Sequence, residues 1–536
     1  MQPISHLAQR VLKLDPPLTR DVIVQRDLRM PMPDDTVLLA DRWAPRSGGE
    51  GLPLVLVRSP YGRRGPVGVQ LGRVPAERGF QVLIQSVRGT HGSGGVFDPM
   101  RQERDDGLAT LEWVVEQPWC GESVVLVGAS YLGYVQWAVA DRLPPQVKAM
   151  IPNMTESALT LEFLRADGLS LETPFTWGVN NALPEPTGVL RGLAQMRRKQ
   201  RALDTLPLSG ADVAATGQRV EYIQDILTHD ADSPRWTGLD HRHRVPEAAV
   251  PVSSVGGWFD IFLPGQIRDF QALQAAGRHA RLTIGPWTHA NLDNTPTREL
   301  LSFGLALARG ERPPERAPVR LYVMGEEAWG DFLSWPPPGY RPQRFHLQPG
   351  GALSTGAPAD SAPDRYLYDP TDPTPAVGGA RAAGGGRKDN TKLETRPDVL
   401  TYTTTVLDQD VEVVGEVSAE IWFRSSRPFA DVFVRLCDVD GRGRSVNVCD
   451  GLVSLSGADK LSRATVRLWP TAYRFRRGHR IRVQVSSGAF PRYARNPGTG
   501  VSPATATATE LRTADQEVFH DPARPSAIIL PMHGAR

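Results

Sequence analysis

Residues 124–140 read VVLVGASYLGYVQWAVA and join a short apolar run to a longer one through the small-residue segment GASYLG. The first run is typical of a strand buried on both faces, and Tyr134–Ala140 is typical of a buried helix. A serine on such a tight turn projects its hydroxyl above the sheet, and Gly128 lets strand and helix approach closely. Ser130 is therefore a candidate nucleophile, although Leu132 breaks the common G-x-S-x-G pattern and a simple connecting turn is the alternative.

The sequence around this turn alternates between apolar runs and helical patterns, which predicts an α/β fold with a parallel sheet. Two strand-like runs at Asp21–Leu28 and Val37–Trp43 predict an antiparallel start. Amphipathic helices are predicted at Asp106–Glu116 and Gln266–Ala275. The buried strands are predicted at Leu54–Val57, Gln81–Gln85, Val124–Val127, Val147–Ile151, Val250–Val255 and Arg281–Ile284.

The length of 536 residues is three to four times that of a typical domain of about 150, so several domains are expected. Helix-like segments at Leu159–Leu164, Val189–Ala202 and Val220–Thr228 interrupt the α/β pattern. Alternating strands dominate the last third, after a turn-rich stretch at Gly350–Lys392 that reads as long loops. We therefore expect an α/β domain in two parts, 1–153 and 248–338, a helical insertion at 154–247, and a β-sandwich or jelly roll at 339–536. Strands of that last domain are predicted at Val411–Phe423, Val432–Val439, Arg463–Leu468 and Arg480–Ser486.

A serine nucleophile on this fold requires an acid and then a histidine, each at the carboxyl end of a later strand. The strand at Val250–Val255 runs into GGWFD, which places Asp260 at its end. The next strand runs into GPWTH, which places His289 likewise. Either residue alone could be an ordinary loop residue, but their joint order predicts a Ser130–His289–Asp260 triad.

Acyl transfer also needs hydrogen-bond donors for the oxyanion that develops on the substrate. The backbone N–H of Tyr131, which follows the nucleophile, should be one donor. The segment RSPYG after the strand at Leu54–Val57 offers the phenol of Tyr61 as the second, with simple packing as the alternative. Trp258 and Trp287 flank the acid and the histidine in sequence and are expected to shield the site from water.

The chain resembles the cocaine esterase and X-Pro dipeptidyl-peptidase family of serine hydrolases along nearly its whole length. The resemblance implies an α/β-hydrolase domain, an inserted helical cap and a C-terminal jelly roll. It also implies that Ser130, Asp260 and His289 form the triad and that Tyr61 and Tyr131 form the oxyanion hole. The segments that carry it are RSPYG, QSVRGTHGSGG, EQPWC, GASYLG, GGWFD, GPWTHANL, VEVVGEVSAEIWF, LCDVDGRGRSVNVCDG and GHRIRVQVSSGAFPRYARN.

The same resemblance suggests where the substrate binds. Trp177 and Phe262 match aromatic pocket positions of the family, although both could be ordinary core residues. The jelly-roll loop that would face the site reads GGGRKDNTK and lacks the apolar pair that lines the acyl pocket in esterases of this family. We therefore expect the cap and this loop to set selectivity, with no strong preference for bulky benzoyl esters.

Three functions remain open from the sequence. The first is hydrolysis of a small-molecule carboxylic ester through an acyl-enzyme. The second uses the same triad on an amide, as a dipeptidyl-peptidase, an amino-ester hydrolase or a biosynthetic acyltransferase; Glu156, Glu162 and Asp167 could then bind a free amino group. The third is a binding protein whose hydrolase site is vestigial, against which the intact triad argues.

The composition excludes other classes. The formal charge is 61 − 59 = +2 with both signs interspersed, so neither nucleic acid nor a membrane is an expected partner. Three cysteines and no apolar leader favour a cytoplasmic protein, which could form a homo-oligomer. The stretch DHRHR, with Asp240, His241 and His243, reads as a solvated surface rather than a metal site. No metal is therefore expected. No cofactor is expected either, because Gly92–Gly94 lacks the following helix that a phosphate loop needs to bind a nucleotide.

Overall fold

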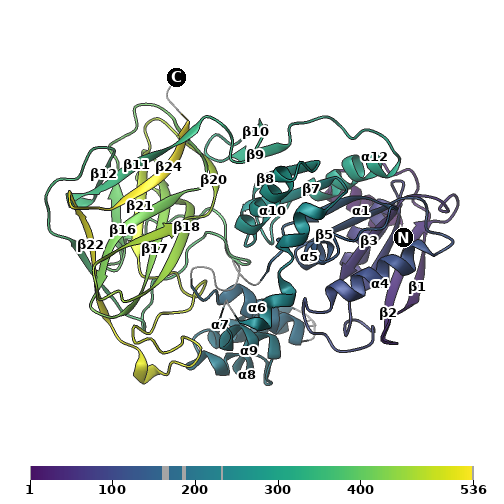
Figure 1. Cartoon of the computed structure of the whole chain (residues 1–536), viewed down its shortest axis with the longest axis horizontal. Coiled ribbons are helices and arrows are strands. Elements are labelled where there is room, and N and C mark those ends of the chain that lie inside the picture. Colours follow the sequence, from purple (N-terminus) through teal and green to yellow (C-terminus); the bar gives the residue numbers. More distant parts are fainter. Residues whose placement is uncertain (1, 160–167, 184–188, 231–232, 534–536) are drawn as a thin grey trace.

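A computed structural model describes residues 2–159, 168–183, 189–230 and 233–533. Figure 1 shows an α/β body coloured purple to teal, a strand-rich body coloured green to yellow, and a group of helices below and between them. The α/β body carries the N-terminus, and the strand-rich body carries the C-terminus. None of the helices within these ranges is long and apolar enough to span a lipid bilayer.

The α/β body is built on a ten-stranded sheet with the strand order β1-β2-β4-β3-β5-β6-β7-β8-β9-β10. Neighbouring strands from β4 to β9 run parallel, while β1 and β2 form the predicted antiparallel start. This arrangement is the predicted α/β-hydrolase fold. The strands are β1 Val22–Pro31, β2 Val37–Pro45, β3 Leu54–Ser59, β4 Gln81–Ser86, β5 Val124–Ala129, β6 Val147–Asn153, β7 Val252–Phe259, β8 Ala280–Thr288, β9 Val319–Val323 and β10 Ala328–Phe332.

Helices cover this sheet, and every residue of β3, β4 and β7 is buried, as expected of strands covered on both faces. Helix α4 begins at Glu103, three residues before the predicted start, with three acidic residues in its first turn, where the helix dipole favours them. The helical segments of this body are α1 Gln2–Val11, α2 Gly65–Val67, η1 Gly68–Arg73, α3 Val74–Ala76, α4 Glu103–Val115, α5 Tyr131–Trp137, α10 Leu263–Ala275, α11 Thr295–Glu299, η5 Leu300–Gly304 and α12 Leu305–Ala308.

The described residues between β6 and β7 form short helices, which we call the cap. The predicted helix at 189–202 has those bounds, and the one predicted at 220–228 begins one residue later. Most of the predicted segment Leu159–Leu164 lies outside the described residues. The cap helices are α6 Glu172–Ala182, α7 Val189–Ala202, η2 Leu208–Gly210, α8 Ala211–Thr216, α9 Glu221–Thr228, η3 Pro234–Leu239 and η4 Arg242–Glu247.

The stretch DHRHR is not uniformly solvated, and for His241 that prediction was wrong. Its side chain is 1% exposed, and its ring lies 5.0 Å from that of Tyr134 on α5. Its backbone N–H donates to the Ser157 carbonyl. Burial lowers the pKa of His241 to about 3, so the ring is neutral at physiological pH.

The last third of the chain forms a β-sandwich, with most strands antiparallel. Two strands, β12 and β13, lie in the stretch predicted as loops. The strand predicted over 411–423 is two strands, because Gly415 has φ +141°, a conformation that favours glycine, and the chain then changes partner from β20 to β19 and β22. The strands are β11 Tyr340–Gln348, β12 Ala352–Ser354, β13 Asp364–Tyr368, β14 Leu400–Thr403, β15 Val411–Gly415, β16 Ser418–Ser425, β17 Phe429–Val439, β18 Ser445–Ser456, β19 Ser462–Arg467, β20 Thr471–Phe475, β21 Arg480–Ser486, β22 Ala514–Asp521, β23 Arg524–Pro525 and β24 Ala527–His533; short η6 Pro349–Gly351, η7 Leu393–Thr395 and η8 Ala508–Glu510 connect them.

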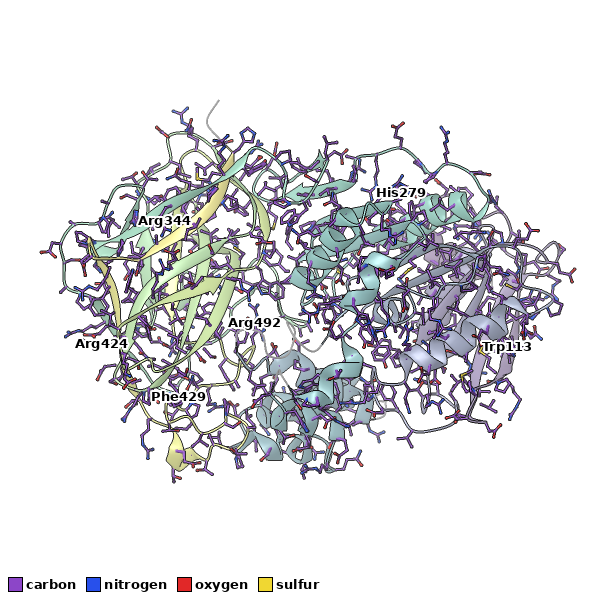
Figure 2. The ribbon with its side chains drawn as sticks, in the orientation of Figure 1. Trp113, His279, Arg344, Arg424, Phe429 and Arg492 are labelled. Atoms are coloured by element: carbon purple, nitrogen blue, oxygen red, sulfur yellow. The ribbon has the colours of Figure 1, made fainter. Side chains whose placement is uncertain are left out.

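The β-sandwich holds the start of cap helix α6. The backbone N–H groups of Leu171 and Glu172 donate to the carbonyls of Arg492 and Pro491, at 2.9 and 3.0 Å. Figure 2 places Arg492 on the side of the β-sandwich that faces the rest of the molecule. The Arg381 guanidinium, from a sandwich loop, binds both carboxylate oxygens of Glu172 at 2.7 and 2.6 Å. Backbone bonds and a bidentate ion pair therefore fix α6 to this domain.

Candidate active site

Ser130 lies on the turn between β5 and α5, with φ 59° and ψ −127°. Positive φ is unusual for a residue with a side chain, and the tight packing around the turn maintains it. A Cβ on Gly128 would lie 2.3 Å from the Leu132 Cβ, and one on Gly133 would lie 2.5 Å from the Thr155 Cγ2. The chain thus comes close to Gly128 and to Gly133, the third residue after the serine, while Leu132 at the second packs against Gly128.

The structure brings Ser130 together with the two other residues of the predicted triad. Asp260 follows the last residue of β7, and His289 follows the last residue of β8. The His289 Nε2 lies 3.1 Å from the Ser130 Oγ, and the His289 Nδ1 lies 2.7 Å from the Asp260 Oδ2. Because an ionised carboxylate only accepts hydrogen bonds, Nδ1 carries the proton and Nε2 is free to accept one from the serine hydroxyl.

Asp260 is held in place by its surroundings, whereas His289 is partly accessible to solvent. The Asp260 side chain is fully buried, and its Oδ1 accepts a 2.8 Å hydrogen bond from the Phe262 N–H. The Phe262 ring packs edge-on against the imidazole at 5.3 Å between centroids. The His289 side chain is 19% exposed. Phe262 therefore contacts both the acid and the histidine, in addition to its expected place in the pocket.

Tyr131 offers its backbone N–H next to Ser130, whereas Tyr61 offers its side-chain hydroxyl. Tyr131 is the first residue of α5, so its N–H has no partner within the helix. The Tyr61 hydroxyl accepts a 2.9 Å hydrogen bond from the Trp177 Nε1 and also interacts with Ser130. Tyr61 is 38% exposed, but desolvation around its hydroxyl raises the pKa of Tyr61, and the hydrogen bonds to Trp177 and Ser130 partly oppose that rise. The phenol is consequently protonated at neutral pH.

The phenol of Tyr131 points away from the serine into the protein. It donates to the Glu103 Oε1 at 2.7 Å and accepts from the Met100 N–H at 2.8 Å. Glu103 in turn forms a buried ion pair with Arg58, at 2.9 Å. We did not predict this network, although the acidic first turn of the helix signals it. Its effect is to fix the turn that presents the Tyr131 N–H.

Trp177 and its neighbours form an aromatic wall next to this turn. The half-buried Trp177 stacks on the Tyr131 ring at 6.0 Å with an interplanar angle of 10°. Tyr222 meets it edge-on at 4.8 Å, and Phe97 lies at 6.4 Å. The glycine-rich sandwich loop approaches from another side, since a Cβ on Gly386 would lie 3.3 Å from the Thr288 Cγ2.

Trp258 and Trp287, which precede the acid and the histidine in the sequence, are both buried in the protein core. The Trp258 indole donates to the Tyr322 carbonyl at 2.7 Å, and its ring lies 6.1 Å from that of Trp335. Trp287 is 8% exposed and clusters with Met154 and Val255. The structure thus gives Trp258 a partner within the core, and the shielding of the triad by Trp258 and Trp287 stays a prediction.

Glu156, expected as a possible ligand for an amino group, is 1% exposed. Its Oε2 lies 3.8 Å from the Arg268 Nη2, and it lines a cavity of about 570 Å³ between α10 and the β-sandwich. Glu162 and Asp167 lie outside the described residues. Within the described ranges no three histidine, cysteine, aspartate or glutamate side chains gather where they could hold a metal ion.

Comparisons with known proteins identify the family of the chain. Residues 34–291 match the family described as X-Pro dipeptidyl-peptidase (S15 family), and residues 315–529 match its C-terminal non-catalytic domain. The chain is 31% identical to the cocaine esterase of Rhodococcus sp. (strain MB1 Bresler), over 95% of this chain and 98% of that one.

Two solved structures share the fold. One is an aminopeptidase from a marine sediment Thaumarchaeota archaeon, and the other is an α-amino acid ester hydrolase, with TM-scores of 0.84 and 0.82. Each is 21% identical, and each match covers 96% of this chain and 97% of the other. The chain therefore belongs to the X-Pro dipeptidyl-peptidase (S15) family of serine hydrolases, and its similarity to the cocaine esterase extends over nearly the whole chain.

Proposed function

We propose that this enzyme hydrolyses carboxylic esters through an acyl-enzyme on Ser130. The observation that carries the proposal is the chain of contacts from the Ser130 Oγ to His289, at 3.1 Å, and from His289 to Asp260, at 2.7 Å. All three residues follow parallel strands at the same edge of the sheet, where substrates reach folds of this class.

In the first step the His289 Nε2 takes the proton of the Ser130 hydroxyl while the serine oxygen attacks the ester carbonyl carbon. The carbonyl oxygen becomes an oxyanion, to which the Tyr131 N–H and the Tyr61 hydroxyl donate. The protonated His289 then gives its proton to the departing alcohol, which leaves the acyl group on Ser130. Water attacks this acyl-enzyme by the same route, releasing the acid and restoring the serine.

An ester is favoured over a substrate with a free amino group by the position of Glu156. The side chain is buried and has the Arg268 guanidinium as a neighbour, so its charge is already balanced within the protein. The ammonium group of such a substrate would have to displace the Arg268 guanidinium from Glu156. We propose peptidase or amino-ester chemistry only as the alternative outcome of the following test.

Labelling with a fluorophosphonate, followed by turnover of a substrate panel, tests the proposed function. We expect the probe to modify Ser130 alone, as located by peptide mass spectrometry. We expect acetyl, butyryl and benzoyl aryl esters to be hydrolysed with kcat/KM values that differ by about tenfold or less, because the polar sandwich loop should make one wall of the pocket more open or more polar. Preferential turnover of aminoacyl amides would replace the esterase by the peptidase function, and a steep benzoyl preference would contradict the open wall.

Replacing Tyr61 with phenylalanine tests the oxyanion donor. The ring keeps its packing and only the hydroxyl is lost, so kcat for an aryl ester should fall by about 10²–10³ while KM changes little. Tyr322→Phe is the matched control, because its hydroxyl donates to Glu327 at the surface. An unchanged kcat in Tyr61→Phe would mean that Tyr61 serves only for packing.

A further inference from the structure

The hydrogen bond between Trp177 and Tyr61 has a fixed direction. An indole N–H can donate but has no lone pair with which to accept. The Tyr61 oxygen, 2.9 Å from the Trp177 Nε1, must therefore be the acceptor. This occupies one side of the hydroxyl oxygen and leaves its own proton to be donated elsewhere. The hydroxyl also interacts with Ser130, beside which the substrate's oxyanion would form.

Trp177 is itself held firmly from several directions. Its ring stacks on Tyr131, and the edge of Tyr222 packs against it. The helix that carries it, α6, is fixed at its start by the Arg381–Glu172 ion pair and by backbone bonds to the β-sandwich. These contacts therefore fix the position of the Trp177 indole N–H relative to Tyr61.

We propose that Trp177 is a positioning residue, which turns the Tyr61 hydroxyl so that its proton points at the oxyanion. This role rests on the proposed function and differs from that of an aromatic wall for the acyl group. A hydroxyl without this donor could rotate and would have to be reoriented in each turnover. Donation from the indole also polarises the phenol and strengthens the hydrogen bond that the phenol gives.

Such a role predicts an effect on the chemical step and not on substrate binding. The ground-state carbonyl carries little charge, whereas the tetrahedral intermediate carries a full one. Loss of the indole N–H should therefore lower kcat and leave KM nearly unchanged. A residue that only lined the acyl pocket would change KM, and its effect would depend on the size of the acyl group.

The test is a double-mutant cycle on Trp177→Phe and Tyr61→Phe, measured with acetyl and benzoyl aryl esters. Phenylalanine keeps an aromatic ring against Tyr131 and removes the N–H. We expect Trp177→Phe alone to lower kcat about 3- to 10-fold for both esters. In the Tyr61→Phe background the same change should alter kcat less than about twofold, because the hydroxyl on which it acts is gone.

Trp236→Phe is the matched control, since that cap indole donates to the Asp230 carbonyl, and it should leave kcat unchanged. Rates are normalised to the number of sites that a fluorophosphonate titrates, so that partial misfolding does not count as lost catalysis. An equal effect of Trp177→Phe in both backgrounds, or a change confined to KM, would overturn the positioning role and leave the esterase intact. If Tyr61 is not an oxyanion donor at all, kcat would instead be unchanged in Tyr61→Phe alone, whereas failure of the proposed function would appear as no fluorophosphonate labelling and no ester turnover in the unchanged enzyme.

Discussion

Replacing Ser130 with alanine is expected to lower kcat for an aryl ester by about 10⁶-fold, because the acyl-enzyme can no longer form. Alanine keeps the Cβ at this position, so the turn at φ 59° is no more strained than before. The melting temperature should therefore stay within about 3 °C of that of the unchanged enzyme. Hydrolysis measured with stopped assays over hours, together with a thermal scan, checks both expectations.

The chain offers a demanding control for this substitution. In the β-sandwich the Ser361 Oγ lies 2.9 Å from the His520 Nδ1, and the His520 Nε2 lies 3.0 Å from the Asp364 Oδ2. This second serine–histidine–aspartate series has a fully buried histidine, 1% exposed, that a substrate cannot reach. Ser361→Ala should keep full activity. Near-normal turnover in Ser130→Ala that disappears when Ser361 is also replaced would refute the assignment of Ser130.

Replacing Asp260 with asparagine should lower kcat by about 10⁴-fold without unfolding the protein. The Oδ1 accepts from the Phe262 N–H, so the asparagine carbonyl should take that side. Its NH₂ group then faces His289 and donates to Nδ1, which moves the imidazole proton to Nε2. A protonated Nε2 cannot accept the serine proton. Single-turnover kinetics should show the loss in the acylation step.

Asp293→Asn is the corresponding control in the loop after His289. Its Oδ1 accepts from the Thr295 N–H, which resembles the Asp260–Phe262 contact, but the side chain is exposed and away from the histidine. We expect its activity to match that of the unchanged enzyme. If Asp260→Asn lost less than about tenfold, the carboxylate would not be setting the histidine tautomer, and another acid would have to be sought.

The strand ends could be predicted from the sequence because they depend on local patterns. Buried strands appear as short apolar runs, and the residues that follow them must meet at one edge of a parallel sheet. This reasoning reached Ser130, Asp260 and His289, which the structure brings within hydrogen-bonding distance. The third residue after the serine, Gly133, could not be interpreted in this way, since its reason lies in Thr155 on another segment.

Features that depend on distant segments escaped prediction. His241 lies in a charged stretch, and only the position of Tyr134 on α5 shows that its ring is buried. The break at Gly415 follows from the change of strand partner, which the alternating pattern of 411–423 does not show. The bond from Trp177 to Tyr61 joins residues 116 positions apart and depends on where α6 rests.

The anchoring of α6 has a consequence for the order in which the enzyme becomes active during synthesis. All three triad residues have left the ribosome once His289 has emerged. The groups that hold α6, Arg381 and the backbone at 491–492, follow between about 90 and 200 residues later, which takes on the order of 5–40 s at elongation rates of about 5–20 residues per second. A nascent chain would thus carry all three triad residues before the last-made domain secures α6, the helix that carries Trp177. We therefore expect full activity to appear only after the β-sandwich has been synthesised and has anchored α6.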